Sequence, residues 1–471
     1  MKKDNYTRMT ESNVYKLIVV LGIPTVISML ITNIYNLADT YFVGTLGESA
    51  QGATGILFTL QSIIQAIAFM LGHGSGTYVA KFLADKDKKN ASRYASCAFF
   101  VGFILGTLLL IFGLIFIKGF CYLLGSTDTI LPYAVDYGMW VLISAPFMIT
   151  SLILNNILRY EGKAIFAMVG LVSGGLLNIF GDYLFINVFN LGIYGAGLST
   201  AISQFISFII LIVLFILHAE SKINPKYLSK HVLDYLKILR SGFPSFLRQG
   251  LTSISGGILN NLCNPYGDSV IAAMSVVNRY LSFVMSIGLG IGQGFQPVCA
   301  FNYQVKKYDR VKKGVIFTML FGILLVSILA IPAIIVPDKI VWLFNTEQRV
   351  IDAGTLALRI GCIGILFLPI SITANMLYQC IRKSEIASFL ALLRSGIVFI
   401  PILYIFEANF NLVGIQIAQP VSDAIAALIS LPFIIFFILK KHESEIKEEK
   451  NEWNNCKKHF RCVIITITKF L

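Results

Sequence analysis

The sequence predicts an all-α integral membrane protein of twelve transmembrane helices, arranged as two pseudo-symmetric six-helix bundles. Of its 471 residues, 56% are hydrophobic and only 13% are charged, whereas about a quarter of the residues of a typical soluble protein are charged. Nearly uncharged segments of 20 or more residues recur from Val14 to Leu439. Each is long enough to cross a hydrocarbon core about 30 Å thick. This composition excludes a soluble enzyme.

Six of these segments precede a basic stretch at 219–236 and six follow it. The first six spans are predicted at 14–43, 52–80, 92–117, 131–157, 164–187 and 192–218. The last six are predicted at 237–263, 268–298, 313–336, 351–378, 386–408 and 412–439. We therefore divide the chain into an N-lobe at 1–218, a cytoplasmic linker at 219–236, a C-lobe at 237–440 and a cytoplasmic tail at 441–471. The apolar part of the tail is too short to span a membrane.

The net charge of +13 is explained by where the basic residues lie. They concentrate in alternate loops, at Lys81–Arg93, Arg159–Lys163, Lys222–Arg240, Lys306–Lys313 and Arg382–Lys383. The other loops carry only Lys118, Lys339 and Arg349. Because loop Lys and Arg remain in the cytoplasm, this bias places both termini inside the cell. A nucleic-acid partner is not needed to explain the charge.

Two short motifs indicate that the halves arose by duplication. Gly22-Ile23-Pro24-Thr25 returns as Gly242-Phe243-Pro244-Ser245, and Leu71–Gly76 returns as Leu289–Gly294, both with nearly the same offset. An even number of spans per half makes the repeats parallel, related by an axis along the membrane normal. The glycine strings lie in apolar segments without the strand or Lys-Ser/Thr of a nucleotide site. They predict close packing of helices or a hinge.

Two acidic residues in the first half are candidates for function, because ionisable groups inside a membrane are costly. Asp39 and Asp182 are both predicted in the outer third of the bilayer, Asp182 roughly 27 Å along span five. Asn178 lies one turn from Asp182 on the same helix face, and Thr200 reaches a similar depth on span six. Such oxygen atoms suit Na⁺ or a transferable proton. The alternative interpretation is that both aspartates only cap helix ends.

These residues resemble those of the multidrug and toxic compound extrusion (MATE) family. The resemblance covers about residues 10–440, is similar to the MepA-like bacterial branch, and rests on Pro24, Asn36–Gly44 around Asp39, Asn178-x-x-x-Asp182, Thr200 and Gln296-Pro297-x-x-x-Phe301-Asn302-Tyr303. It implies a V-shaped, monomeric transporter in a bacterial inner (plasma) membrane. The transporter would export bulky, mostly cationic drugs or dyes in exchange for Na⁺ or H⁺ by alternating access. No cofactor other than the coupling ion is expected.

The resemblance also implies roles for single residues. Asp39, Asn178, Asp182 and Thr200 would form the cation-coupling site, where Na⁺ is the possible metal, and Pro24 would let span one bend. The sequence departs from the NorM-type branch, whose C-lobe acids are not found. Span seven offers Arg248 and Gln249, and span ten offers Asn375.

The second half is predicted to hold a buried ion pair in place of a cation site. Away from their ends its spans carry Arg248, Arg279, Arg359 and Arg394 against Asp423 and Glu407. Arg394 is predicted about 12 Å from the inner face and Asp423 about 16 Å from the outer face, so their depths nearly meet. We therefore expect Arg394 and Asp423 to pair, with Arg279 as the competing partner.

Two other function classes were weighed against export. A flippase for lipid-linked precursors would suit the same architecture, but an anionic headgroup calls for basic cavity residues in both lobes. The first lobe shows none deep in its spans. A membrane-embedded enzyme lacks a His-rich or Ser/His/Asp constellation. His73 could relay protons, although a lone helical histidine is more often a packed polar residue.

Overall fold

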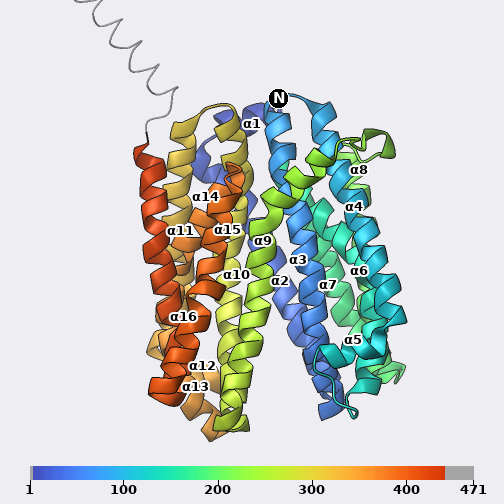
Figure 1. Cartoon of the computed structure of the whole chain (residues 1–471), viewed down its shortest axis with the longest axis vertical. Helices are drawn as coiled ribbons and strands as arrows, with labels where there is room; N and C mark the ends of the chain where they lie inside the picture. Colours follow the sequence, from blue (N-terminus) through green and yellow to red (C-terminus); the bar gives the residue numbers. More distant parts are fainter. Residues whose placement is uncertain (1–3, 441–471) are drawn as a thin grey trace, which may run out of the picture.

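The computed structural model describes residues 4–440, except for the side chain of Asp268. The prediction of a cytoplasmic tail at 441–471 lies outside this part of the chain. Over the described residues every regular element is a helix. The predicted all-α fold is confirmed, and it is organised as two lobes that lie side by side (Figure 1).

Six long helices and two short ones form the N-lobe. They are α1 (Asn5–Glu11), α2 (Val14–Gly44), α3 (Glu48–Ala84), α4 (Lys88–Ile115), α5 (Ile117–Leu123), α6 (Leu131–Tyr160), α7 (Ala164–Asp182) and α8 (Gly192–His218). A π-helical segment, η1 (Tyr183–Val188), continues α7 directly after Asp182. Such π segments are rare and are frequent at functional sites.

The C-lobe repeats this order. Its helices are α9 (Val232–Cys263), α10 (Asp268–Gln304), α11 (Tyr308–Ile335), α12 (Pro337–Phe344), α13 (Gln348–Ile365), α14 (Leu368–Cys380), α15 (Ser384–Leu392) and α16 (Phe399–Leu439). A second π segment, η4 (Leu393–Ile397), contains Arg394. The short helices α5 and α12 occupy equivalent places after α4 and α11, which is what duplication of a six-helix unit predicts.

The helices account for all twelve predicted spans. Within the described chain, nine helical stretches are long and apolar enough to cross a membrane, and α13 with α14 forms a tenth across a bend of 43°. The longest stretch, Ser384–Leu439, contains a break at Asn411, whose φ of 51° lies outside the helical region. This break separates spans eleven and twelve. The remaining span is α9, 32 residues long, whose polar residues face the other lobe and the cavity described below.

The lobes meet at the end of the molecule that holds the N-terminus and diverge toward the other end (Figure 1). Glycines make the closed end possible. A Cβ added at Gly242 of α9 would lie 1.7 Å from the carbonyl oxygen of Met70, and one at Gly294 of α10 would lie 2.4 Å from the Cα of Gly22. At the other end, Gly55 of α3 and Gly257 of α9 have no described atom within 4 Å of such a Cβ. The predicted role of the glycine motifs in close packing is confirmed.

The connection between the lobes, residues 219–231, is held against the N-lobe by backbone hydrogen bonds. The Glu161 carboxylate accepts bonds from the backbone nitrogens of Glu220 and Ser221, at 2.6 and 3.0 Å. Burial raises the pKa of the Glu161 carboxyl, and these hydrogen bonds offset part of that rise. At the start of α9, Asp234 forms an ion pair with Arg93 of α4. The lobes are therefore joined here both by the chain itself and by an ion pair between α9 and α4.

The substitution Gly242→Ala should destabilise the closed end, because its Cβ would meet backbone that cannot move independently. We expect a loss of about 1–3 kcal/mol and a lower melting temperature in detergent. The matched control is Gly257→Ala, which adds the same methyl group in open space and should be neutral or stabilise by up to about 1 kcal/mol. Equal melting temperatures for the two variants would contradict this account of the interface.

Candidate functional site

The acidic cluster lies inside the N-lobe, where three helices converge. Asp39 comes from α2, Asn178 and Asp182 from the end of α7, and Thr200 from α8. Asp182, Asn178 and Thr200 are buried, with exposed fractions of 0%, 3% and 8%. The structure therefore brings together all four residues that the sequence singled out for a cation.

Hydrogen bonds fix part of this cluster. Asn178 Nδ2 donates to Thr200 Oγ1 at 3.3 Å, and the Ser199 hydroxyl donates to the backbone carbonyl of Asn178 at 3.0 Å. The Tyr137 hydroxyl on α6 donates to Asp39 Oδ2 at 3.1 Å. Asp39 and Asp182 are close enough to interact electrostatically.

The remaining acceptor atoms have no donor. Asp39 Oδ1, Asn178 Oδ1 and both carboxylate oxygens of Asp182 are buried without a hydrogen-bond partner among the described residues. Ser199 lies beside Asp182, but its hydroxyl proton goes to Asn178. Burying unpaired carboxylate oxygens costs free energy unless a proton or a cation satisfies them. A set of two carboxylates, an amide oxygen and a hydroxyl fits Na⁺ as well as H⁺.

A small cavity of about 10 Å³ reaches this cluster, with walls that include Asp39, Tyr137, Asn178 and Thr200. Its size is that of a single water molecule or ion. Within residues 4–440 no three His, Cys, Asp or Glu side chains gather as a metal site. The small cavity and its oxygen donors suit a monovalent ion or a proton.

Tyr137 was missed by the sequence analysis. Its phenol touches Asp39 and also lies near Gln61 Nε2 of α3, at 3.4 Å. A tyrosine in a transmembrane helix carries no charge, so the cost argument that found the aspartates does not find it. The only available signal was that Asp136 and Tyr137 reach the same depth as the acidic pair.

Pro24 lies buried within α2, which continues unbroken through it. Proline has no N–H, so the carbonyl four residues earlier loses its helical donor. The Ser28 hydroxyl donates to the Pro24 carbonyl at 2.9 Å, and Thr25 donates to the Leu21 carbonyl at 3.0 Å. Side-chain bonds to the backbone of this kind accompany a locally weakened helix.

In the C-lobe the structure places Arg394 against Asp423. Arg394 Nε donates to Asp423 Oδ1 at 2.7 Å, and Gln419 Nε2 donates to the same oxygen at 2.9 Å. Asp423 is buried, whereas Arg394 is partly exposed. Arg279 has no carboxylate within ion-pair distance in the part of the chain that is described. Asp423 therefore pairs with Arg394 and not with the competing partner, Arg279.

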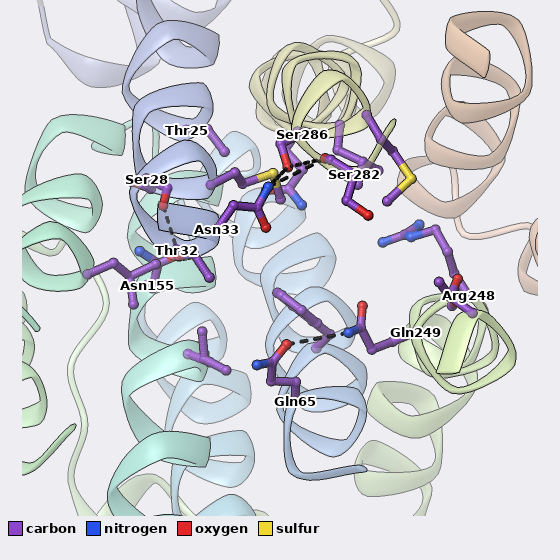
Figure 2. Close-up of a pocket in the computed structure, with 18 of the residues that line it drawn as sticks. Thr25, Ser28, Thr32, Asn33, Gln65, Asn155, Arg248, Gln249, Ser282 and Ser286 are labelled. Atoms are coloured by element: carbon purple, nitrogen blue, oxygen red, sulfur yellow. Dashed lines mark hydrogen bonds between the residues drawn. The ribbon is translucent and has the colours of Figure 1, made fainter. Parts of the chain in front are cut away.

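A larger cavity of about 300 Å³ lies between the lobes. Its wall combines methionines and aromatic rings with amides and hydroxyls. Figure 2 shows polar residues of α2, among them Ser28, Thr32 and Asn33, across the cavity from Arg248 and Gln249 of α9. Hydrogen bonds cross between the lobes at this level: Asn33 Nδ2 donates to Ser286 Oγ at 2.8 Å and to the Ser282 carbonyl at 3.4 Å, and Gln249 Nε2 donates to Gln65 Oε1 at 3.4 Å.

The charged groups that line this cavity are Arg159, Arg248 and Arg394, and no Asp or Glu is among the described residues of its wall. Arg159 corrects the sequence analysis, which assigned it to an internal loop. It is the penultimate residue of α6, is only 4% exposed, and bonds to Asn156, His73 and Gln293. Hydropathy placed the end of this span before Arg159, so a buried cation next to the cavity was taken for a solvated one.

His73 joins the same network. Its ring nitrogens contact Ser245 Oγ of α9 at 2.7 Å and Arg159 Nη2 at 3.0 Å. The histidine is fully buried and touches both lobes. It is a polar contact of the closed end, as its interpretation as a packed residue predicted.

Comparisons with known proteins agree with this architecture. A profile of the MatE family matches residues 24–184 and 244–405. The chain is 26% identical over 456 residues to the multidrug export protein MepA of Staphylococcus saprophyticus, covering 95% of this chain and 99% of that protein. For MepA of Staphylococcus aureus strain MRSA252, identity is 27% over 443 residues, covering 93% and 97%. The crystal structure of MATE in complex with MaL6 has a TM-score of 0.88 at 23% identity, covering 93% of this chain and 99% of that one.

A double-mutant cycle should detect the Arg394–Asp423 pair. Arg394→Met should lower thermal stability in detergent by about 3 kcal/mol or more, because it leaves the buried Asp423 carboxylate without its partner. Asp423→Asn should cost less, because Arg394 is partly exposed. The double variant should lose less than the sum, with a coupling energy of about 0.5–3 kcal/mol. Arg279→Met combined with Asp423→Asn is the control and should be additive. Additive losses for both arginines would refute the pairing.

Proposed function

Because the chain belongs to the MATE family, we propose that it exports bulky small molecules in exchange for a cation bound at Asp39, Asn178, Asp182 and Thr200. The chain is a transporter and not an enzyme. The observation that carries the proposal is the set of unpartnered carboxylate oxygens beside an inter-lobe cavity. The coupling ion is Na⁺ or H⁺, and the chain works as a monomer.

The multidrug character of the proposed export follows from the MepA relatives and from the wall of the cavity. Four methionines line it: Met29, Met148, Met168 and Met285. Methionine side chains are flexible and polarisable, so they adapt to differently shaped ligands. Amide and hydroxyl groups between them can donate to and accept from the polar parts of varied compounds.

The proposed orientation puts the closed end in the cytoplasm. The basic loops gather at that end, and they are expected to stay inside. The lobes part at the opposite end, so the structure corresponds to an outward-facing state of the proposed alternating-access cycle. Both termini are cytoplasmic in this arrangement of a bacterial inner (plasma) membrane protein.

Exchange would arise because the cation and the exported compound favour different arrangements of the lobes. A ligand shifts a conformational equilibrium only by its difference in affinity between the states. The helix α2 is suited to transmit that difference, because Asp39, the cavity residue Asn33 and the interface residue Gly22 all lie on it. Neither covalent chemistry nor a further cofactor is required.

The cavity wall bears on two expectations, the charge of the substrate and the flippase alternative. The preference for cationic compounds rests on family resemblance, whereas the cavity wall offers such compounds no carboxylate. The flippase was disfavoured because the first lobe showed no deep basic residue, and the position of Arg159 removes that argument. Relatives named as multidrug exporters still favour export of free compounds.

Replacing the acids should abolish coupling. Asp39→Asn and Asp182→Asn should each reduce gradient-driven export in proteoliposomes to background, because each removes a carboxylate needed to hold the ion. Asp136→Asn, an exposed acid of α6, is the control and should transport at the wild-type rate. Wild-type rates for both Asp39→Asn and Asp182→Asn, in protein with an unchanged melting temperature, would exclude this cluster as the coupling site.

The substitution Pro24→Ala should slow turnover more than it weakens substrate binding. Alanine restores the missing N–H donor and favours a straight helix. It should therefore stiffen α2, which is proposed to bend in the transport cycle. The measurements are the export rate at equal protein amount and the equilibrium binding of a substrate dye in detergent. Lost binding with normal turnover would instead assign Pro24 to the cavity wall.

A further inference from the structure

We infer that the central cavity binds the anionic group of an amphiphilic substrate, a carboxylate, sulfonate or phosphate, through Arg248. This inference rests on the proposed export function and names its substrate class. The charges of the cavity wall, together with the hydrogen bonds that each arginine makes, lead to it.

Arg248 is the arginine that is free to contact a ligand. Its only bond to the described protein is from Nη1 to Asn375 Oδ1, at 2.8 Å. A guanidinium has five N–H donors in a planar fork, so most of its donors remain for a ligand. Figure 2 shows the side chain reaching from α9 into the cavity. A planar fork of this kind matches the two oxygens of a carboxylate or a phosphate.

The ion pairs and hydrogen bonds of the other two arginines determine the net charge of the cavity wall. Arg394 is neutralised by Asp423, which does not line the cavity. Among the described residues, Arg159 bonds to neutral groups only: the amides of Asn156 and Gln293 and the imidazole of His73. Arg159 and Arg248 therefore leave two uncompensated positive charges on the wall, one from each lobe.

The acids of the N-lobe do not cancel these charges at the cavity surface. Asp39 and Asp182 are absent from the described residues of the wall, and Asp39 reaches the smaller cavity behind it. The two cavities share Tyr35, Asn36, Met148 and Gln204 as a common boundary. Negative charge is thus kept on the side of the ion site and positive charge on the side of the substrate.

The three classes of ligand differ in how they meet this wall. A cation would face two uncompensated guanidinium groups without a carboxylate to contact. A neutral compound that covers Arg248 would leave its charged donors without water or a partner, which is costly. An anion satisfies the free donors of Arg248 and offsets the buried charge of Arg159, and an apolar body can pack on Phe58, Phe69 and the methionines. An amphiphilic anion is therefore the class that this site selects.

The test compares two probes with one aromatic body, pyrenebutyrate and (4-pyrenylbutyl)trimethylammonium, binding to purified protein in detergent. The wild type should bind the carboxylate at least about tenfold more tightly. Arg248→Gln should weaken pyrenebutyrate binding by roughly tenfold to a hundredfold, since a charge-assisted hydrogen bond is lost, and should leave the ammonium probe nearly unchanged. Arg248→Lys keeps the charge but not the planar fork, so it should retain only part of the affinity.

The matched control is Arg359→Gln, which removes an equal charge at an exposed position outside the cavity; its affinity for both probes should equal that of the wild type. Equal or tighter binding of the ammonium probe would overturn the inference. So would unchanged pyrenebutyrate binding in Arg248→Gln.

Proteoliposomes with an imposed Na⁺ or H⁺ gradient separate this inference from the proposed function. If the ammonium probe is exported and pyrenebutyrate is not, the export function stands and the inference fails. If neither probe responds to a gradient, the export function fails, and the binding comparison alone still decides the charge preference.

A third arm distinguishes free anions from lipid headgroups. Transbilayer movement of NBD-labelled phosphatidylglycerol that is lost in Arg248→Gln would assign the site to a lipid headgroup. Loss of pyrenebutyrate export alone would assign it to a free amphiphile. Either result supports an anionic ligand at Arg248, whereas loss of neither would refute it.

Discussion

The cost of placing charge inside a membrane-spanning bundle governs the arrangement of this molecule. Each deep charge must be paired, neutralised by a proton or ion, or placed at a wet cavity. Asp423 is paired with Arg394, Arg248 lies on the cavity wall, and Asp182 is buried with neither oxygen hydrogen-bonded to a described residue. These three outcomes correspond to a structural pair, the proposed binding surface and the proposed ion site.

The glycine contacts at the closed end determine how these regions communicate. At Gly242 and Gly294 the backbones of α9 and α10 rest almost directly on the N-lobe. Contact between backbones leaves little room for gradual sliding, so the lobes are expected to separate as a unit. The helix α2 passes from this interface along the cavity to Asp39, and we therefore propose that it connects ion binding with closure.

The sequence predicted the helices and the acidic cluster, because both depend on local cost. Long apolar runs must be helices in lipid, and matching depths brought Asp39 and Asp182 together. The cavity could not be predicted in this way. Arg159 lies at the end of its span, where depth does not distinguish a solvated side chain from a buried one, and Tyr137 carries no charge. Both depend on which face of α6 turns inward, and that is decided by packing against α3 and α8.

The separation of charge restricts how exchange can work. In a transporter whose substrate is a cation, the ion and the substrate can compete directly for the same carboxylates. Here an anionic substrate at Arg248 would be attracted by a cation at Asp39 and Asp182. The electrostatic interaction would therefore favour binding of both ligands at once. Exchange then requires that the two ligands stabilise different lobe arrangements strongly enough to exceed this attraction, because a ligand shifts an equilibrium only through its differential affinity. The common boundary of Tyr35, Asn36, Met148 and Gln204 weakens the attraction by keeping the charges apart, which lowers the difference in affinity between lobe arrangements that exchange requires.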